Sequence, residues 1–91
     1  MSRLCIAILT YRRPEALARA LPYVLAHARA LERDNPGVAA AVLVVDNDPA
    51  GSAEAAVAEF GDAMLRYVRE AEPGISAARN RALDEAADAE L

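Results

Sequence analysis

The sequence contains no lysine and no tryptophan, and it has one cysteine and one histidine among 91 residues. Because Cys5 is alone, an internal disulfide and a cysteine-based metal cluster are both excluded. Cys5 lies inside an apolar run, which predicts a small buried core residue. His27 has no second His or Cys at ligand spacing, which argues against a metal role. Without lysine, any contact with phosphate must use arginine or a backbone N–H group.

An excess of positive charge is also missing. The formal net charge of −4 argues against a general nucleic-acid binder, which needs positive charge to release counterions from phosphates. No apolar stretch approaches the roughly 20 residues of a transmembrane helix, and the N-terminus lacks the separate charged and apolar regions of a signal peptide. We therefore expect a cytoplasmic protein without a transmembrane segment. Membrane association stays open for a longer form of the protein.

Short apolar runs predict the strands. Residues 4–9 and 41–45 are unbroken apolar runs, which are typical of parallel strands buried on both faces. Residues 64–69 are more polar, as expected of a half-exposed edge strand.

Three helices are predicted between and after these strands. Pro14 favours the start of the first helix, and one of its faces is apolar: Leu17, Leu21, Val24, Ala28 and Leu31. Pro22 predicts a kink there, or two shorter helices. Residues 52–60 predict a second helix, which Gly61 ends. Ser76 is the expected cap of a third helix that runs towards Ala89. Alternating strands and helices predict an α/β fold with a parallel sheet.

The loops after the three strands are the candidate binding region, because open parallel sheets bind ligands at the carboxyl ends of their strands. These are residues 10–14, 46–52 and 70–76. Asp46 can accept a hydrogen bond from a uracil-like base or a ribose hydroxyl, or it can cap a turn. Tyr11 can stack on a base, or cover the sheet edge.

The last predicted helix has an unusual order of charges. Arg79 and Arg81 come near its start, and four acidic residues crowd its second half: Asp84, Glu85, Asp88 and Glu90. This order opposes the helix macrodipole. A bound diphosphate would explain the arginines. The alternative is that Arg81 pairs with Glu85 and that Arg79 is only solvated.

Three segments together resemble a known family. CIAILTYRRPEALARAL, VLVVDNDPAGS and EPGISAARNRALDEA are similar, in order and spacing, to the N-terminal part of family 2 glycosyltransferases, which have the GT-A fold and use nucleotide-activated sugars. The resemblance implies a three-layer α/β/α fold, the Rossmann-like half of GT-A, with strand order 3-2-1. It identifies residues 1–91 as the nucleotide-binding part, which ends before the metal-binding Asp-x-Asp motif.

The same resemblance implies the residues that bind the donor. Thr10 and Tyr11 match the base-binding loop, Asp46 the acid that contacts the base, and Arg79 the arginine near the diphosphate. The full expected set is Thr10, Tyr11, Arg13, Asp46, Asp48, Gly74, Arg79 and Asn80. The sequence departs from the family where Asn47, Asp48 and Pro49 stiffen the second loop.

The resemblance implies a fragment without catalytic residues. The donor would be a UDP-sugar, transferred with inversion to an acceptor hydroxyl, and the longer enzyme would use a divalent metal (Mn or Mg) with no ligand in this chain. The alternative is a short, non-catalytic α/β module for nucleotide binding or assembly. If the family's fourth strand is absent, residues 4–9 form an exposed apolar edge, which predicts a homodimer or other self-association.

Overall fold

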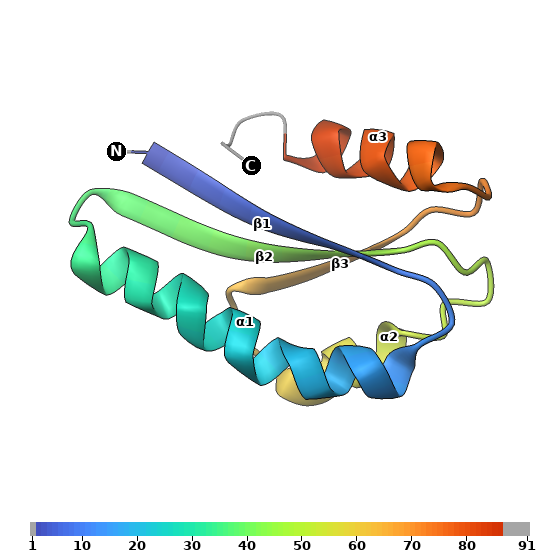
Figure 1. Cartoon of the computed structure of the whole chain (residues 1–91), viewed down its shortest axis with the longest axis horizontal. Coiled ribbons are helices and arrows are strands. Elements are labelled where there is room, and N and C mark those ends of the chain that lie inside the picture. Colours follow the sequence, from blue (N-terminus) through green and yellow to red (C-terminus); the bar gives the residue numbers. More distant parts are fainter. Residues whose placement is uncertain (1, 87–91) are drawn as a thin grey trace.

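Three parallel strands form an open sheet with β2 in the centre (Figure 1). The computed structural model describes residues 2–86, and the predicted end of the last helix at Ala89, with Asp88 and Glu90, lies outside them. The elements, in chain order, are β1 (Ser2–Thr10), α1 (Pro14–Asp34), β2 (Val38–Asp46), α2 (Glu54–Phe60), β3 (Leu65–Arg69) and α3 (Ile75–Glu85). The α/β class and the parallel sheet are confirmed. An order with β2 between β1 and β3 occurs in many α/β folds, so the assignment to GT-A stays a prediction.

The register of the sheet brings the strand ends together. Thr10 of β1 pairs with Asp46 of β2, and Asp46 pairs in turn with Arg69 of β3. All three strands therefore end at one edge of the sheet, and the loops that follow them start side by side.

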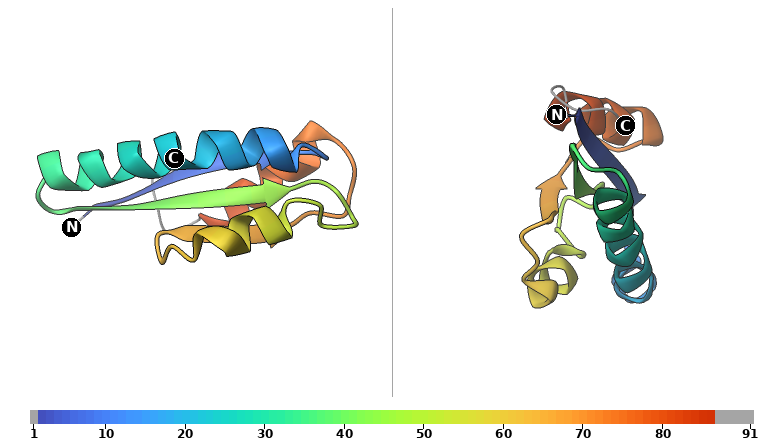
Figure 2. Two further views of the ribbon diagram at one scale, coloured as in Figure 1. Left: turned by 90° about the horizontal axis from the view of Figure 1, so that it is seen from below. Right: turned by 90° about the vertical axis from the view of Figure 1, so that its left-hand side faces the viewer.

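Helices pack against both faces of β2, as Figure 2 shows. Val42 and Val44 face α1 and α2, where they pack with Leu21 and Leu25 among others. Leu43 and Val45 face the other way and pack with α3. Because every second residue faces each helix layer, the central strand needs an unbroken apolar sequence, and this explains the run at residues 41–45.

The helix α1 corrects one expectation. It runs as a single helix from Pro14 to Asp34 through Pro22, so the prediction of two shorter helices is wrong. Leu21 and Leu25 are buried on either side of the proline, and their packing offsets a lost backbone hydrogen bond and steric clash that cost about 3 kcal/mol. Leu25 takes the buried position predicted for Val24, which is only partly buried.

The starts of the two shorter helices also differ from the sequence prediction. Ser76 lies inside the first turn of α3, whose N-cap is Gly74, so Ser76 is not the cap. Gly74 has φ 112°, a conformation that only glycine adopts without strain. The helix α2 starts at Glu54, two residues later than expected. No helix within residues 2–86 is long and apolar enough to cross a membrane.

Candidate functional site

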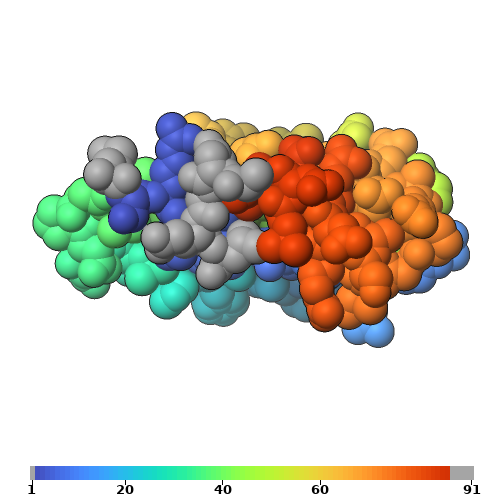
Figure 3. Space-filling model, turned by 90° about the horizontal axis from the view of Figure 1, so that it is seen from above, coloured from blue at the N-terminus to red at the C-terminus, as the bar shows by residue number. Residues whose placement is uncertain are grey.

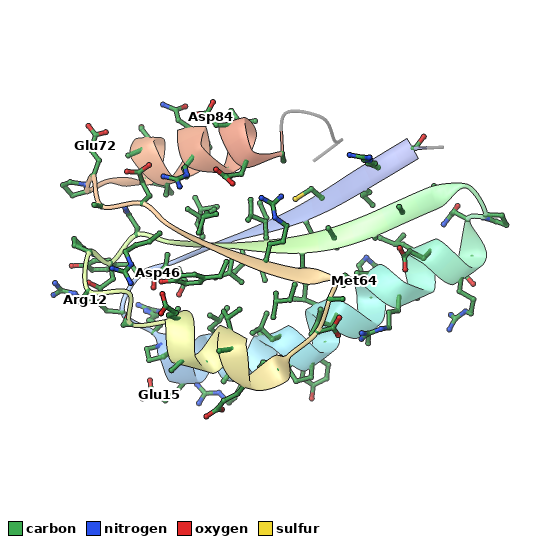
Figure 4. The ribbon with its side chains drawn as sticks, turned by 180° about the vertical axis from the view of Figure 1, so that it is seen from behind. Arg12, Glu15, Asp46, Met64, Glu72 and Asp84 are labelled. Carbon is green, nitrogen blue, oxygen red and sulfur yellow. The ribbon has the colours of Figure 1, made fainter. Side chains whose placement is uncertain are left out.

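A cleft of about 360 Å³ opens at the edge where the strands end. One wall is the end of β1 and its loop, the other is the start of α3, and Asn47 lies between them. The lining residues are Leu9, Thr10, Tyr11, Asn47, Pro73, Gly74, Ile75 and Ala78. Figure 4 shows Arg12, Asp46 and Glu72 at this same end of the molecule. The cleft thus occupies the place where open α/β sheets bind ligands.

Asp46 organises the loop between β2 and α2. Its side chain is 0% exposed. One carboxylate oxygen accepts the N–H of Asp48 at 3.1 Å, and the other accepts the N–H of Ala53 at 2.9 Å and the hydroxyl of Tyr67 at 2.8 Å. A buried carboxylate requires such partners. Here the bonds to Asp48 and Ala53 fix the loop, and α2 begins only after it, at Glu54. A nucleotide base reaches Asp46 only if one of these bonds opens, so the base contact stays a prediction.

Tyr67 completes this arrangement from β3. Removal of its hydroxyl from water raises the pKa of Tyr67, and the hydrogen bond to the Asp46 carboxylate raises it further. Arg69, two residues later, donates hydrogen bonds to the carbonyl of Pro49 at 3.2 Å and to the Glu54 carboxylate at 3.2 Å. Two residues of β3, Tyr67 and Arg69, therefore hold the loop from Asp46 to Glu54 in place.

Asn47 ties the loop between β3 and α3 to the centre of the sheet. Its amide nitrogen donates to the carbonyls of Glu70 at 2.9 Å and Glu72 at 2.8 Å, and its amide oxygen accepts the N–H of Gly74 at 3.2 Å. Its backbone N–H donates to the carbonyl of Thr10 at 2.9 Å. Asn47 therefore sets the distance between the two walls of the cleft.

Arg12 has a strained backbone beside the cleft. Its φ is 50°, the only positive value among the described residues other than glycine. Its guanidinium carbon lies 5.0 Å from the centre of the Tyr11 ring, and its Nε lies 3.7 Å from the Asp48 carboxylate. Asp48 is 3% exposed, and its pKa is lowered, chiefly by the N–H of Ala50 and further by Arg12. Backbone strain of this kind is concentrated at functional sites.

The structure separates the predicted site residues into three groups. Thr10, Tyr11 and Gly74 line the cleft, whereas Asp46 and Asp48 are buried beneath the loop after β2. The remaining residues do not line it: Arg13, Arg79 and Asn80. Arg13 borders a second hollow, on another side of Thr10 and Tyr11.

The two arginines of α3 differ in their surroundings. Arg81 lies 3.7 Å from Glu70 and 3.3 Å from Glu85, which confirms the alternative that it forms an ion pair along the helix. Arg79 is exposed, one helical turn after Ile75, which lines the cleft. Residues four apart share a helix face, so Arg79 is the guanidinium group of α3 that can reach the cleft mouth.

Asn47 and Arg12 lie in the predicted strand-end loops, but they are not in the predicted set of site residues. Asn47 stands out in the sequence only because it departs from the family pattern, and its three loop contacts come from residues 23 to 27 positions away. No local signal in the sequence reports such contacts. For Arg12 the available signal was its place directly after Tyr11 in a strand-end loop.

The part of the chain that the structure describes does not supply a metal site. Within residues 2–86, no group of three or more His, Cys, Asp or Glu side chains gathers in a way that could hold a metal ion. We therefore assign no step to the divalent metal that the family resemblance implies.

The comparisons with known proteins give no relative. No protein-family model, no curated protein and no solved structure matches this chain. Any function must therefore be argued from its own residues.

Asp46→Asn is expected to destabilise the fold. The new amide group can accept at one atom only, so at least one of the three donors loses its acceptor, at a cost of about 1–3 kcal/mol. Urea unfolding of this variant and of Tyr67→Phe and the double variant measures the coupling between the two side chains. Asp84→Asn, an exposed position on α3, is the matched control and should change stability little. Equal effects at Asp46 and Asp84 would contradict the role of Asp46.

The unfolding free energy is expected to fall at high pH. The pKa of Tyr67 is raised in the folded state. The contribution of Tyr67 to the free energy of unfolding is therefore fully present below its pKa in the unfolded chain, which is about 10. That contribution is lost as the pH rises through the higher pKa of the folded state. Urea unfolding from pH 8 upward should show this fall, and Tyr67→Phe should make it smaller. Tyr23→Phe, at the most exposed tyrosine, should leave the profile as it is. An identical profile in both variants would contradict the account.

Proposed function

We propose that this chain is the nucleotide-binding portion of a family 2 glycosyltransferase and that its cleft holds the nucleotide of a UDP-sugar donor. The observation that carries the proposal is the position of the cleft at the carboxyl ends of parallel strands. Three residues that the sequence resemblance selects line it: Thr10, Tyr11 and Gly74. The proposal includes the finer fold, a three-layer Rossmann-like half of GT-A with strand order 3-2-1.

The chemistry of the cleft suits a nucleoside. Its volume of about 360 Å³ falls in the range of small-ligand sites. Leu9, Pro73 and Ile75 offer apolar surface to a planar base. Arg12 covers one face of the Tyr11 ring, and a base would stack on the opposite face. The side-chain hydroxyl of Thr10, which lines the cleft, offers a hydrogen-bonding group for the ribose.

The start of α3 suits the diphosphate. The helix has no side-chain cap at its N-terminus, so the N–H groups of its first turn are open to an anion. Arg79 adds a guanidinium group one turn further along, and such groups bind phosphate oxygens in pairs. In this assignment Asp46 and Asp48 position the loop, and the predicted contact of Asp46 with the base requires one of its three hydrogen bonds to open. Transfer to an acceptor would need residues outside this chain.

Calorimetric titration with UDP tests the proposal. We expect binding that Tyr11→Ala and Arg79→Ala each weaken by about 3- to 10-fold, the effect of losing one stacking or charge-assisted contact. Arg33→Ala removes another exposed arginine, from the far end of α1, and should leave the affinity unchanged. Titration with ADP and GDP reports the choice of base.

Two outcomes would contradict the proposal. One is the absence of heat with every nucleotide at millimolar concentration. The other is binding that all three variants weaken equally, because this would indicate a general charge effect. Either result would favour the alternative of an assembly module.

A further inference from the structure

The strand β1 is an unpaired edge within residues 2–86. Its only hydrogen-bonded neighbour there is β2. The strand is nine residues long, contains no proline and carries one charged residue, Arg3. Natural edge strands are usually protected against pairing by charges, prolines, bulges or short length. β1 is regular and paired with β2 along its whole length, and it has little of this protection.

Exposed hydrophobic side chains gather along the same edge. The described residues include five large hydrophobic side chains that are 37–77% exposed: Leu9, Tyr11, Tyr23, Ile75 and Leu83. All but Tyr23 belong to the end of β1, its loop or α3. In Figure 3, part of β1 (blue) is visible at the surface on the same side of the molecule as α3 (orange to red).

One flank of α3 faces the open side of β1. Arg81 and Glu85 contact Glu70 and Arg66, which come from β3 and the loop after it. Ala78 and Ala82 face the sheet. The opposite flank, which carries Leu83, therefore lies on the side of β1.

We propose that β1 pairs in antiparallel orientation with β1 of a second copy of this chain, around a two-fold axis at Ile6. The proposal does not rest on the proposed function. Ile6 is the middle residue of Ser2–Thr10, so this register pairs the whole strand and extends the sheet to six strands. Opposed residues point to the same face of a sheet. The pairs are then apolar on both faces: Leu4 with Ile8 of the partner subunit, and Cys5 with Ala7 of the partner subunit.

The charges and the helices agree with this register. Arg3 falls opposite Leu9 of the partner subunit, so no like charges meet along the strand. The helix α3 packs on both Cys5 of β1 and Leu43 of β2, so it lies over the gap between them. With strands about 4.8 Å apart, the two α3 axes come about 10 Å from each other, which is a normal helix-packing distance. Leu83 lies on the flank that would face the second helix.

The small size of the contact indicates a weak dimer. A nine-residue edge is about 30 Å long, and a strip that includes one helix layer on each side covers about 600 Å² per partner, slightly less than the roughly 800 Å² of a standard interface. We therefore expect a dimer that dissociates in the micromolar range.

Sedimentation equilibrium of the whole chain tests the proposal. At about 50 µM the chain should be dimeric, consistent with an interface of small-to-standard size. Leu83→Lys places like charges on the two facing flanks, while a cation near a helix C-terminus does not disfavour folding, so the dissociation constant should rise about tenfold or more. Tyr23→Lys is the matched control, on α1 away from the edge, and should not change it. A wild-type monomer at this concentration would overturn the proposal. The partner of the β1 edge would then be a segment other than β1 of a second copy.

A cross-linking experiment tests the register. Ala7→Cys places a thiol opposite Cys5 of the partner subunit, at the separation of about 4.5–5.5 Å between Cβ atoms of opposed residues. Mild oxidation with oxidised glutathione should then give a covalent dimer on a non-reducing gel. The double variant Ala7→Cys with Cys5→Ser should give none, because the introduced thiol then faces a serine hydroxyl. A dimer that forms but does not cross-link, or that cross-links equally in both variants, would overturn this register. Circular dichroism of each variant reports whether it folds.

Discussion

The hydrogen bonds of Asp46 and Asn47 are the interaction on which the edge of this sheet depends. The two residues follow one another at the end of the central strand, and each holds a different loop. The side chain of Asp46 is buried and holds the loop before α2 through Asp48, Ala53 and Tyr67. Asn47 lies between the walls of the cleft and holds the loop before α3. Arg69 adds a further hold on the first of these loops, through the carbonyl of Pro49 and the carboxylate of Glu54.

This arrangement separates the residues that shape the cleft from those that line it. A carboxylate that is fully buried and bonded to three donors stabilises a loop, but its oxygens are not open to a ligand. The exposed surface of the cleft is instead apolar side chains, the Tyr11 ring, backbone groups and the amide of Asn47. The guanidinium group of Arg12, whose backbone is strained, lies beside both the Tyr11 ring and the Asp48 carboxylate. The cleft is thus preformed, which lowers the entropic cost of binding a ligand there.

The sequence predicted the parts of the fold that depend on hydrophobic periodicity. The apolar runs at residues 4–9 and 41–45 form strands as expected, and most of the predicted face of α1 is buried. Burial on both faces is confirmed for β2 only, because in β1 only Cys5 is buried and Leu9 is exposed. The continuity of α1 through Pro22 was not predictable, since it depends on packing between Leu21, Leu25 and residues of the sheet. The cap of α3 was missed because Gly74 takes its place through a positive φ and a bond to Asn47, neither of which leaves a local pattern.

The position of the cleft was predicted more successfully than the residues that line it. The strand-end rule located the edge at which the cleft lies, because it depends only on the order of strands and helices. It could not separate lining residues from buried ones, since Asp46 and Asn47 are neighbours in sequence and the end of β2 directs their side chains to different places.

The central claim is that the cleft between Tyr11, Asn47 and Gly74 binds a nucleotide. Nuclear magnetic resonance of the ¹⁵N-labelled chain, titrated with UDP, tests it most directly. The account predicts shifts confined to the amides of residues 9–12, 47 and 74–79, with the far end of the molecule around residues 33–39 unchanged. Shifts that are absent at saturating UDP, or that centre on any other part of the chain, would contradict it.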